Sequence, residues 1–186
     1  KEKYRLKEGA LLKLLKNPDS KDKGFKLLVD LYQEKIYWMI RKIVLSHDSA
    51  NDVLQDTYIR IFKGIDNFKE KSKLSTWIYR IAYNESIRFL NKESKMKKVE
   101  LDSKDDNYSR KLFADTFFDA NNLSLKFHQI LSELSIRQRN IFNMKYFDEL
   151  KFEEIAKITD ININTVKSVY YKVEKKIKKE INESSL

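Results

Sequence analysis

Polar side chains that can hydrogen-bond to base edges or to phosphates follow one face of a predicted helix near the end of the chain. Amide and hydroxyl groups can distinguish base edges, and lysine can neutralise a phosphate. An amphipathic helix packed on any small bundle also has a polar face, so contact with DNA is a hypothesis here. The residues on this face are Asn164, Thr165, Lys167, Ser168, Tyr171 and Lys172.

Two short helices joined by a tight turn would position this face. Ala156 is small where the two helices must approach each other, and Asp160 lies at the turn, where Asp tolerates a left-handed backbone. Asn162 can cap the second helix by accepting a hydrogen bond from its first free amides. This layout is typical of a helix-turn-helix, whose second helix enters the major groove of DNA. Its buried side is predicted from apolar residues at steps of three and four, namely Ile163, Val166, Tyr170, Val173 and Ile177.

Another helix, predicted from residue 75 to about residue 90, combines aromatic, arginine and amide side chains. Arginine can hold a nucleic-acid backbone, an aromatic ring offers a stacking surface, and an Asn amide can distinguish a base edge, which together suit a single strand. The alternative is that the Trp is a core residue and that the arginines only solvate the helix. Helical spacing places four side chains on one strip, which are Trp77, Arg80, Asn84 and Arg88.

Two further groups precede this helix. The loop of residues 68–73 could line a pocket for a base removed from the stack, through Phe68, Lys71 and Lys73. The helix before the loop carries an acidic and amide patch in an otherwise basic part of the chain. Such a patch is a poor surface for phosphate and suits the docking of a protein, although a solvated helix face would look the same. Its residues, spaced by three and four, are Asp52, Gln55 and Asp56.

The composition favours an all-α protein. The 186 residues include three Gly and one Pro, 35% of them are charged, and long segments follow the helical period. The formal net charge of +10 suits a polyanionic partner, although many lysine-rich proteins have none.

The residues that usually bind metals offer little. Cysteine is absent, and His47 and His128 lie far apart without the spacing of metal ligands. We therefore expect no metal, no cofactor and no catalytic residue. No apolar run approaches roughly 18 residues and no signal peptide is evident, so we expect a cytoplasmic protein without membrane insertion. The chain begins with Lys1 rather than Met, and we expect the natural protein to begin upstream.

The predicted helices form two small domains joined by a flexible linker. Residues 1–96 hold four helices, the third of which is expected to be capped by Asp48 or Ser49. Residues 97–122 form the linker, because their first part has few apolar residues and no helical period. Residues 123–186 begin with a helix at about 123–134 and continue with one that Ser135 and Gln138 would open as a capping box. The helix-turn-helix follows.

Three motifs, in order along the chain, resemble those of the extracytoplasmic-function (ECF) sigma factors of bacterial RNA polymerase. Residues 49–62 resemble the Ala-x-Asp-x-x-Gln-x-x-Phe segment of that family, and residues 68 and 75–84 resemble its promoter-melting segment. Residues 134–139, 146–150 and 154–168 resemble its second DNA-binding domain. The matches cover nearly all of residues 10–180, and the linker lies where the family has its own.

The resemblance implies a sigma factor that binds core RNA polymerase, positions it at promoters and melts DNA, without catalysing a reaction itself. The patch of Asp52, Gln55 and Asp56 would dock on the clamp helices of the largest polymerase subunit. The apolar surface near Ile130, Leu131 and Phe147 would receive the flap of the second-largest subunit. An anti-sigma factor is a further partner that the resemblance suggests.

The resemblance also assigns the promoter DNA. Residues 1–96 would correspond to sigma region 2 and recognise the minus-ten element, with Asn84 capturing a flipped base. Residues 123–186 would correspond to region 4 and recognise the minus-thirty-five element. The minus-ten residues would be Phe68, Lys71, Lys73, Trp77, Arg80, Asn84 and Arg88. The minus-thirty-five residues would be Arg137, Arg139, Asn164, Thr165, Lys167, Ser168, Tyr171 and Lys172.

The chain departs from the family pattern at three places. The family often has Gly where this chain has Asp160, a Ser cap where it has Lys151, and an Asp near the position of Arg88. Glu153 and Glu154 would offset the missing cap through the helix dipole.

Two alternatives to a sigma factor remain at the level of the sequence. One is a helix-turn-helix transcription regulator with an N-terminal sensing or dimerisation domain. The other is a nuclease, which would need clustered carboxylates or histidines for metal-assisted hydrolysis, and the acidic residues here are scattered.

Overall fold

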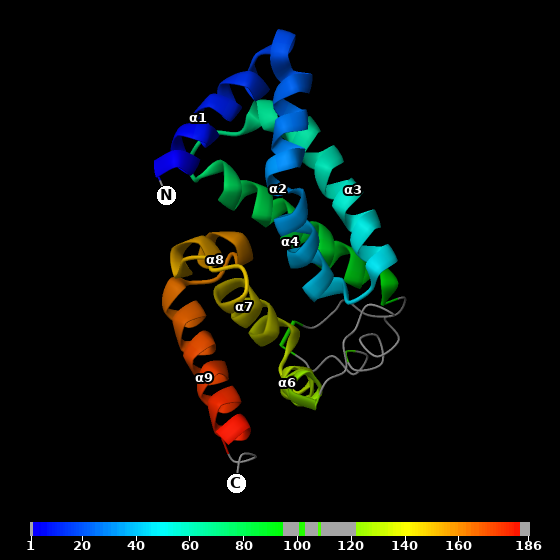
Figure 1. Cartoon of the computed structure of the whole chain (residues 1–186), viewed down its shortest axis with the longest axis vertical. Helices are drawn as coiled ribbons and strands as arrows, with labels where there is room; N and C mark the ends of the chain where they lie inside the picture. Colours follow the sequence, from blue (N-terminus) through cyan, green and yellow to red (C-terminus); the bar gives the residue numbers. More distant parts are fainter. Residues whose placement is uncertain (1, 95–100, 103–107, 109–121, 183–186) are drawn as a thin grey trace.

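The computed structural model describes residues 2–94, 101–102, 108 and 122–182. Over these residues the regular elements are eight α-helices and two short 3-10 helices, which confirms the all-α fold class. The first half, residues 2–94, contains α1 (Glu2–Lys16), α2 (Lys21–Val44), α3 (His47–Gly64) and α4 (Leu74–Glu93), with 3-10 turns at Pro18–Ser20 and Ile65–Asn67. The second half, residues 122–182, contains α6 (Asn122–Ser132), α7 (Ile136–Tyr146), α8 (Phe152–Thr159) and α9 (Ile163–Asn182) (Figure 1).

The first half packs around one apolar core, because each helix carries an apolar stripe at helical spacing. Gly24 allows α1 and α2 to cross closely, since a methyl group at this position would lie 2.9 Å from Leu14 Cβ. The core side chains with no exposed surface include Leu15, Leu28, Ile36, Ile40, Ile61, Ile65 and Ile78.

The ends of α2 and α3 are set by local backbone chemistry. α2 ends at Leu45, which has a left-handed backbone with φ of 65°. α3 is capped by Ser46, whose hydroxyl accepts a hydrogen bond from the Ser49 amide at 3.4 Å. The prediction that Asp48 or Ser49 caps α3 is therefore wrong, because both residues already lie in its first turn.

The second half confirms the local predictions for its helix ends. Ser135 and Gln138 form the capping box that opens α7, with N–O distances of 3.0 and 3.2 Å. Asp160 ends α8 with φ of 59° and ψ of 39°, the left-handed conformation expected at the turn. The Asn162 side chain accepts a hydrogen bond from the Asn164 amide at 2.8 Å, so it caps α9. The α9 stripe is buried at Val166, Tyr170, Val173 and Ile177, and Ile163 is half-buried.

The two halves pack against each other, with α4 against α8 and α2 against α7. Tyr79 and Tyr83 of α4 are each 5% exposed in this contact. Lys42 of α2 forms an ion pair with Asp148, at the end of α7, across the same boundary. No pattern in the sequence indicates this contact between the two halves. We call the arrangement in which the two halves are packed together the closed arrangement.

Most of the predicted linker lies outside the described residues. Leu101, Asp102 and Tyr108 are described, and all three lie against α7 or its neighbours. The Arg137 amide donates to the Leu101 carbonyl at 2.8 Å, and the Arg137 guanidinium pairs with Asp102 at 3.1 Å. No helix among the described residues is long and apolar enough to cross a membrane.

Candidate nucleic-acid interface

The polar face predicted on the second helix of the helix-turn-helix is exposed along α9. The capped and left-handed turn before α9 aims this face away from α7 and α8, which cover the opposite, apolar side. Tyr171 is 55% exposed, and its ring lies 5.9 Å from the Phe152 ring, which limits its motion. The structure thus brings six predicted residues together on one exposed surface: Asn164, Thr165, Lys167, Ser168, Tyr171 and Lys172.

The strip predicted on α4 is also formed, with one difference. Arg80, Asn84 and Arg88 are exposed, whereas Trp77 is half-buried. The Trp77 ring lies 5.1 Å from the Phe68 ring and also covers Gly64, where a methyl group would meet the ring at 3.4 Å. Trp77 therefore exposes only part of its ring: the core interpretation of this residue holds in part, and stacking on a base stays a prediction.

Phe68 requires a correction. It is 6% exposed, with its ring against Trp77, so it does not form an open wall of a base pocket as predicted. The 3-10 turn Ile65–Asn67 directs it inward, and its amide donates to the Ile65 carbonyl at 3.1 Å. Its contribution in this structure is to support Trp77 from behind. Lys71 and Lys73 of the same loop are exposed.

Two basic residues of the predicted minus-ten surface face acidic groups of the second half. Lys73 Nζ donates to Glu154 Oε1 at 2.7 Å, and Arg80 Nη2 lies 3.7 Å from Asp160 Oδ1. Glu154 also accepts a hydrogen bond from the Lys151 amide at 3.0 Å, which is the half of a capping box that the residue at the third helical position supplies. The closed arrangement therefore engages two side chains that were predicted to contact DNA.

Arg139 is also absent from the exposed surface to which it was assigned. Its side chain is 0% exposed, and its guanidinium lies 4.2 Å from the centre of the Tyr108 ring. In this arrangement it is a core residue of the second half and takes no part in the exposed surface. Arg137 is half-buried and is paired with Asp102. The spacing of neighbouring residues could not predict the burial of Arg139, because the Tyr108 ring that covers it is distant in sequence.

The acidic and amide patch lies on the exposed side of α3, as predicted, with Asp52, Gln55 and Asp56 all exposed. Beside it, α2 and α3 form an apolar groove of about 490 Å³. Ile59 and Phe62 are 44% and 37% exposed at its edge, and the Phe25 ring lies 5.0 Å from the Phe62 ring. An acidic rim next to exposed apolar side chains is typical of a protein-docking surface.

Glu85, which follows Asn84 on α4, was not predicted from the sequence as a functional residue. Glu85 is 6% exposed, and its carboxylate accepts hydrogen bonds from Arg88 Nη1 at 2.6 Å to each oxygen. The same carboxylate pairs with Arg60 Nε of α3. The spacing of Glu85 and Arg88 by three residues could have suggested their pairing, but nothing local indicates Arg60.

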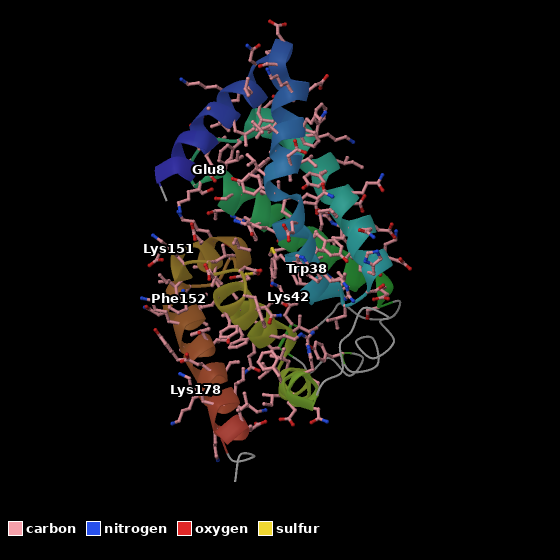
Figure 2. The ribbon with its side chains drawn as sticks, in the orientation of Figure 1. Glu8, Trp38, Lys42, Lys151, Phe152 and Lys178 are labelled. Carbon is pink, nitrogen blue, oxygen red and sulfur yellow. The ribbon has the colours of Figure 1, made fainter. Side chains whose placement is uncertain are left out.

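A cleft of about 1190 Å³ separates part of α1 and α2 from the turn between α7 and α8. Figure 2 shows Glu8 on one side, Trp38 and Lys42 on α2, and Lys151 at the start of α8. Trp38 and Phe147 are 53% and 48% exposed here. Of the surface expected to receive the flap, only Phe147 is exposed, because Ile130 and Leu131 are each 2% exposed and belong to the core.

Two carboxylates at the boundary between the halves have opposite pKa shifts. Burial raises the pKa of Asp148, and the charge and hydrogen bond of Lys42 only partly offset this. Burial also acts to raise the pKa of Glu154, but the hydrogen bonds from Lys73 and Lys151, with their charges, outweigh it and lower the pKa. Burial raises the pKa of Tyr79 between them, with both carboxylates adding to the shift.

Two family models match the chain, sigma-70 region 2 over residues 28–96 and sigma-70 region 4 over residues 124–177. The ECF RNA polymerase sigma factor SigW of Bacillus subtilis is 29% identical over 167 residues, covering 85% of this chain and 89% of that protein. The ECF RNA polymerase sigma-E factor of Haemophilus influenzae is 27% identical over 184 residues, covering 95% and 96%.

Two solved structures share the fold. CnrH, in complex with the cytosolic domain of CnrY, matches with a TM-score of 0.66 and 16% identity over 95% of this chain and 97% of that chain. The sigma factor RpoE from Bartonella quintana, in complex with the anti-sigma factor NepR, matches with a TM-score of 0.62 and 22% identity over 86% and 98%.

The two family models match both halves of the molecule, in the order that the motifs predicted. The region 2 match covers α3, α4 and most of α2 in the first half, so the alternative of a regulator that uses only its helix-turn-helix is not supported. The chain therefore belongs to the sigma-70 family, and within it to the ECF sigma factors, which act in promoter-directed transcription initiation.

Proposed function

We propose that this sigma factor docks on core RNA polymerase through α3 and recognises its promoter through α4 and α9. The observation that carries the proposal is that α4 exposes Asn84 between Arg80 and Arg88 while packing on α3, which exposes Asp52, Gln55 and Asp56. A polymerase bound to α3 would then lie beside the DNA held on α4. The division into residues 1–96, 97–122 and 123–186 is part of this proposal.

The minus-ten element would meet the exposed strip of α4. Asn84 can form paired hydrogen bonds with a base edge, while Arg80 and Arg88 hold the separated strand and Lys71 adds a charge from the loop. Trp77, supported by Phe68, would present the exposed part of its ring to the adjacent base. Recognition of a base outside the stack needs such a rigid surface, because the flipped base loses its own stacking partners.

The minus-thirty-five element would meet the exposed face of α9. This face combines Asn164, Thr165 and Ser168, which can contact base edges, with Lys167 and Lys172, which can contact phosphates. Insertion into a groove needs a helix that projects from its domain, and the tight turn at Asp160 provides this projection. Arg137 would join this surface once its pairing with Asp102 is released, whereas Arg139 is not proposed as a DNA contact.

The closed arrangement must open before both elements can be bound. Lys73 and Arg80 face Glu154 and Asp160 in the closed state, so promoter phosphates compete with these carboxylates for the same cations. We propose that binding of α3 to the polymerase, together with DNA, separates the halves.

An anti-sigma factor would favour the closed state. One similar structure was solved with the anti-sigma factor NepR, and another was solved with the cytosolic domain of CnrY. The cleft with exposed Trp38 and Phe147 is the proposed contact surface on this chain. Because RNA polymerase works in the cytoplasm, we propose a cytoplasmic location for this protein. We also propose that the polymerase alone catalyses RNA synthesis.

Transcription in vitro tests the proposal. Purified core RNA polymerase and this chain, incubated with genomic DNA, should start RNA synthesis at defined positions, and core enzyme alone should not. The double variant Asp52→Asn, Asp56→Asn should lose polymerase binding, whereas Asp19→Asn, an exposed acidic residue in the Pro18–Ser20 turn, should behave like the wild type. A stable complex that yields no defined start sites would overturn the proposal.

A further inference from the structure

Glu85 is a buried carboxylate between two proposed functional helices. It is 6% exposed on α4, and it contacts Arg88 of α4 and Arg60 of α3. A buried carboxylate without partners is strongly unfavourable, so the two arginines are needed to retain it. The same contacts act on the arginines, because each loses rotamer freedom when it is held by the carboxylate.

Both arginines keep hydrogen-bond donors for another ligand. Their side chains are 51% exposed for Arg60 and 54% exposed for Arg88. Arg60 uses Nε for Glu85 and Arg88 uses Nη1, so Glu85 leaves the other guanidinium N–H groups available. Arginine presents five donors in a planar fork, which allows one guanidinium to bind a carboxylate and a phosphate together.

The position of Glu85, Arg60 and Arg88 on the molecule suggests which ligand the remaining guanidinium donors would bind. Arg88 lies four residues after Asn84, which is about 6 Å along the helix axis. The groove between α3 and α4, of about 820 Å³, brings Arg60 and Lys63 of α3 opposite Arg88 and Lys92 of α4, and its lining also includes Asp52, Gln55 and Asp56 of the docking patch. A strand whose base is bound at Asn84 has its next phosphates within reach of Arg88, on the α4 side of this groove.

We propose that Glu85 is a positioning residue that holds Arg60 and Arg88 as a paired phosphate clamp for the separated promoter strand. The inference rests on the proposed function, and it adds Arg60 and Glu85 to the residues that serve strand binding. Fixing a long side chain beforehand reduces the entropy cost of binding, so the clamp gains affinity although Glu85 itself repels phosphate.

The sign of one measurement separates this role from a simple charge effect. Glu85→Gln removes a negative charge near DNA, which by itself would tighten binding. If Glu85 positions the arginines, the variant should instead weaken binding of holoenzyme to a forked promoter oligonucleotide with a single-stranded minus-ten segment, by about three- to tenfold. The control Glu133→Gln removes an equal charge from an exposed ion pair with Lys176, on the other half, and should leave the affinity unchanged.

Two further readouts separate positioning from loss of stability. The slope of log affinity against log salt should become shallower by roughly 0.7 for each phosphate that the arginines no longer bind, which a merely destabilised protein would not show. In a background with Arg60→Gln and Arg88→Gln, whose neutral amides can still donate hydrogen bonds to the carboxylate, adding Glu85→Gln should no longer weaken binding, because no guanidinium remains to be positioned.

A second variant keeps the test valid if Glu85→Gln unfolds. Glu85→Asp retains the charge but is one methylene shorter, so it should also weaken binding of the fork while polymerase binding stays intact. Equal or tighter binding by both variants would overturn the positioning role. Failure of the wild-type holoenzyme to bind the fork would instead overturn the proposed function.

Discussion

Asn84 is the exposed amide at the centre of the α4 strip, with an arginine one turn away on either side. Asn84→Ala should lose discrimination at one minus-ten position and leave polymerase binding intact, because one amide contributes about 1–3 kcal/mol of base selectivity. The measurement is transcription from promoters that match or mismatch at each minus-ten position.

The matched control for Asn84 is Gln129→Ala, which removes an exposed amide from α6. It should leave both the activity and the promoter preference unchanged. An equal fall of transcription from matched and mismatched promoters in Asn84→Ala would mean that Asn84 does not select a base.

Asp148 makes the closed arrangement sensitive to pH. Burial raises its pKa above the ordinary 3.8, so the closed state favours the protonated carboxyl. Its contribution to closure is therefore fully present below the ordinary pKa and is lost as the pH rises through the raised value. Asp148→Asn stays neutral, so it should remove this part of the pH dependence and close at least as well as the wild type at about pH 7.

The comparison for Asp148 is Glu154, whose pKa is lowered from 4.5. Its contribution has the opposite sign, since it is present above the ordinary pKa and is lost as the pH falls through the lowered value. The closed fraction should be measured from about pH 4 to 7. Asp148→Asn should remove the part of the closed fraction that falls as the pH rises, and Glu154→Gln should remove the part that increases with pH. Identical pH profiles for Asp148→Asn and the wild type would contradict the assignment.

At the scale of elements, the crossing of α1 and α2 depends on the missing side chain of Gly24. Ala is better than Gly in a helix interior by about 1 kcal/mol, yet Gly24→Ala should destabilise the fold. The added methyl group would lie 2.9 Å from both Leu14 Cβ and the Leu15 amide nitrogen, so the two helices would have to move apart. The measurement is the free energy of unfolding in urea.

Gly9 provides the control within α1, since a methyl group there would meet nothing within 4 Å. Gly9→Ala should therefore raise the free energy of unfolding, by about 0.5–1 kcal/mol. If Gly24→Ala were stabilising to the same extent, the close crossing of the two helices would be wrong.

α1 also reaches α4, the helix proposed to bind the minus-ten element, through Glu8. The Glu8 carboxylate accepts a hydrogen bond from the Ser75 amide in the first turn of α4 at 3.2 Å and one from the Tyr32 hydroxyl at 2.9 Å. The amides at the start of α4 lack a side-chain cap from Lys73, so a residue distant in sequence satisfies one of them. α1 therefore helps to fix where the strip of α4 begins.

At the scale of the whole molecule, the ion pair of Lys73 and Glu154, which joins the halves, should affect how often the chain opens. The pair of Lys73 and Glu154 is partly exposed, and such pairs contribute about 0.5–1 kcal/mol. Glu154→Gln keeps an acceptor for the Lys151 amide but removes the charge, so it should raise the ratio of open to closed molecules by about two- to fivefold.

Opening can be followed by energy transfer between two introduced thiols, because the chain has no cysteine of its own. Asp19→Cys and Lys178→Cys place one label on each half, at exposed positions. Glu133→Gln breaks an ion pair within the second half and should leave the transfer unchanged. A transfer efficiency that Glu154→Gln does not alter would show that this pair does not hold the halves together.

The sequence by itself determined the features that depend on neighbours along the chain. The helical period predicted the helices and the exposed face of α9, and local side-chain chemistry predicted the Ser135 box, the Asn162 cap and the left-handed Asp160. These interactions join residues two to four positions apart, so their spacing is visible in the sequence.

Only the tertiary structure decided which polar groups are buried and what they contact. Glu85 meets Arg60, Arg139 lies under Tyr108, and Lys42 meets Asp148, all across long distances in sequence. Helical periodicity predicts that a residue faces inward or outward relative to its own helix, but it does not reveal which second element covers it. For this reason the family resemblance assigned Arg139 to an exposed surface although its side chain is buried, and the sequence did not indicate the closed packing of the two halves.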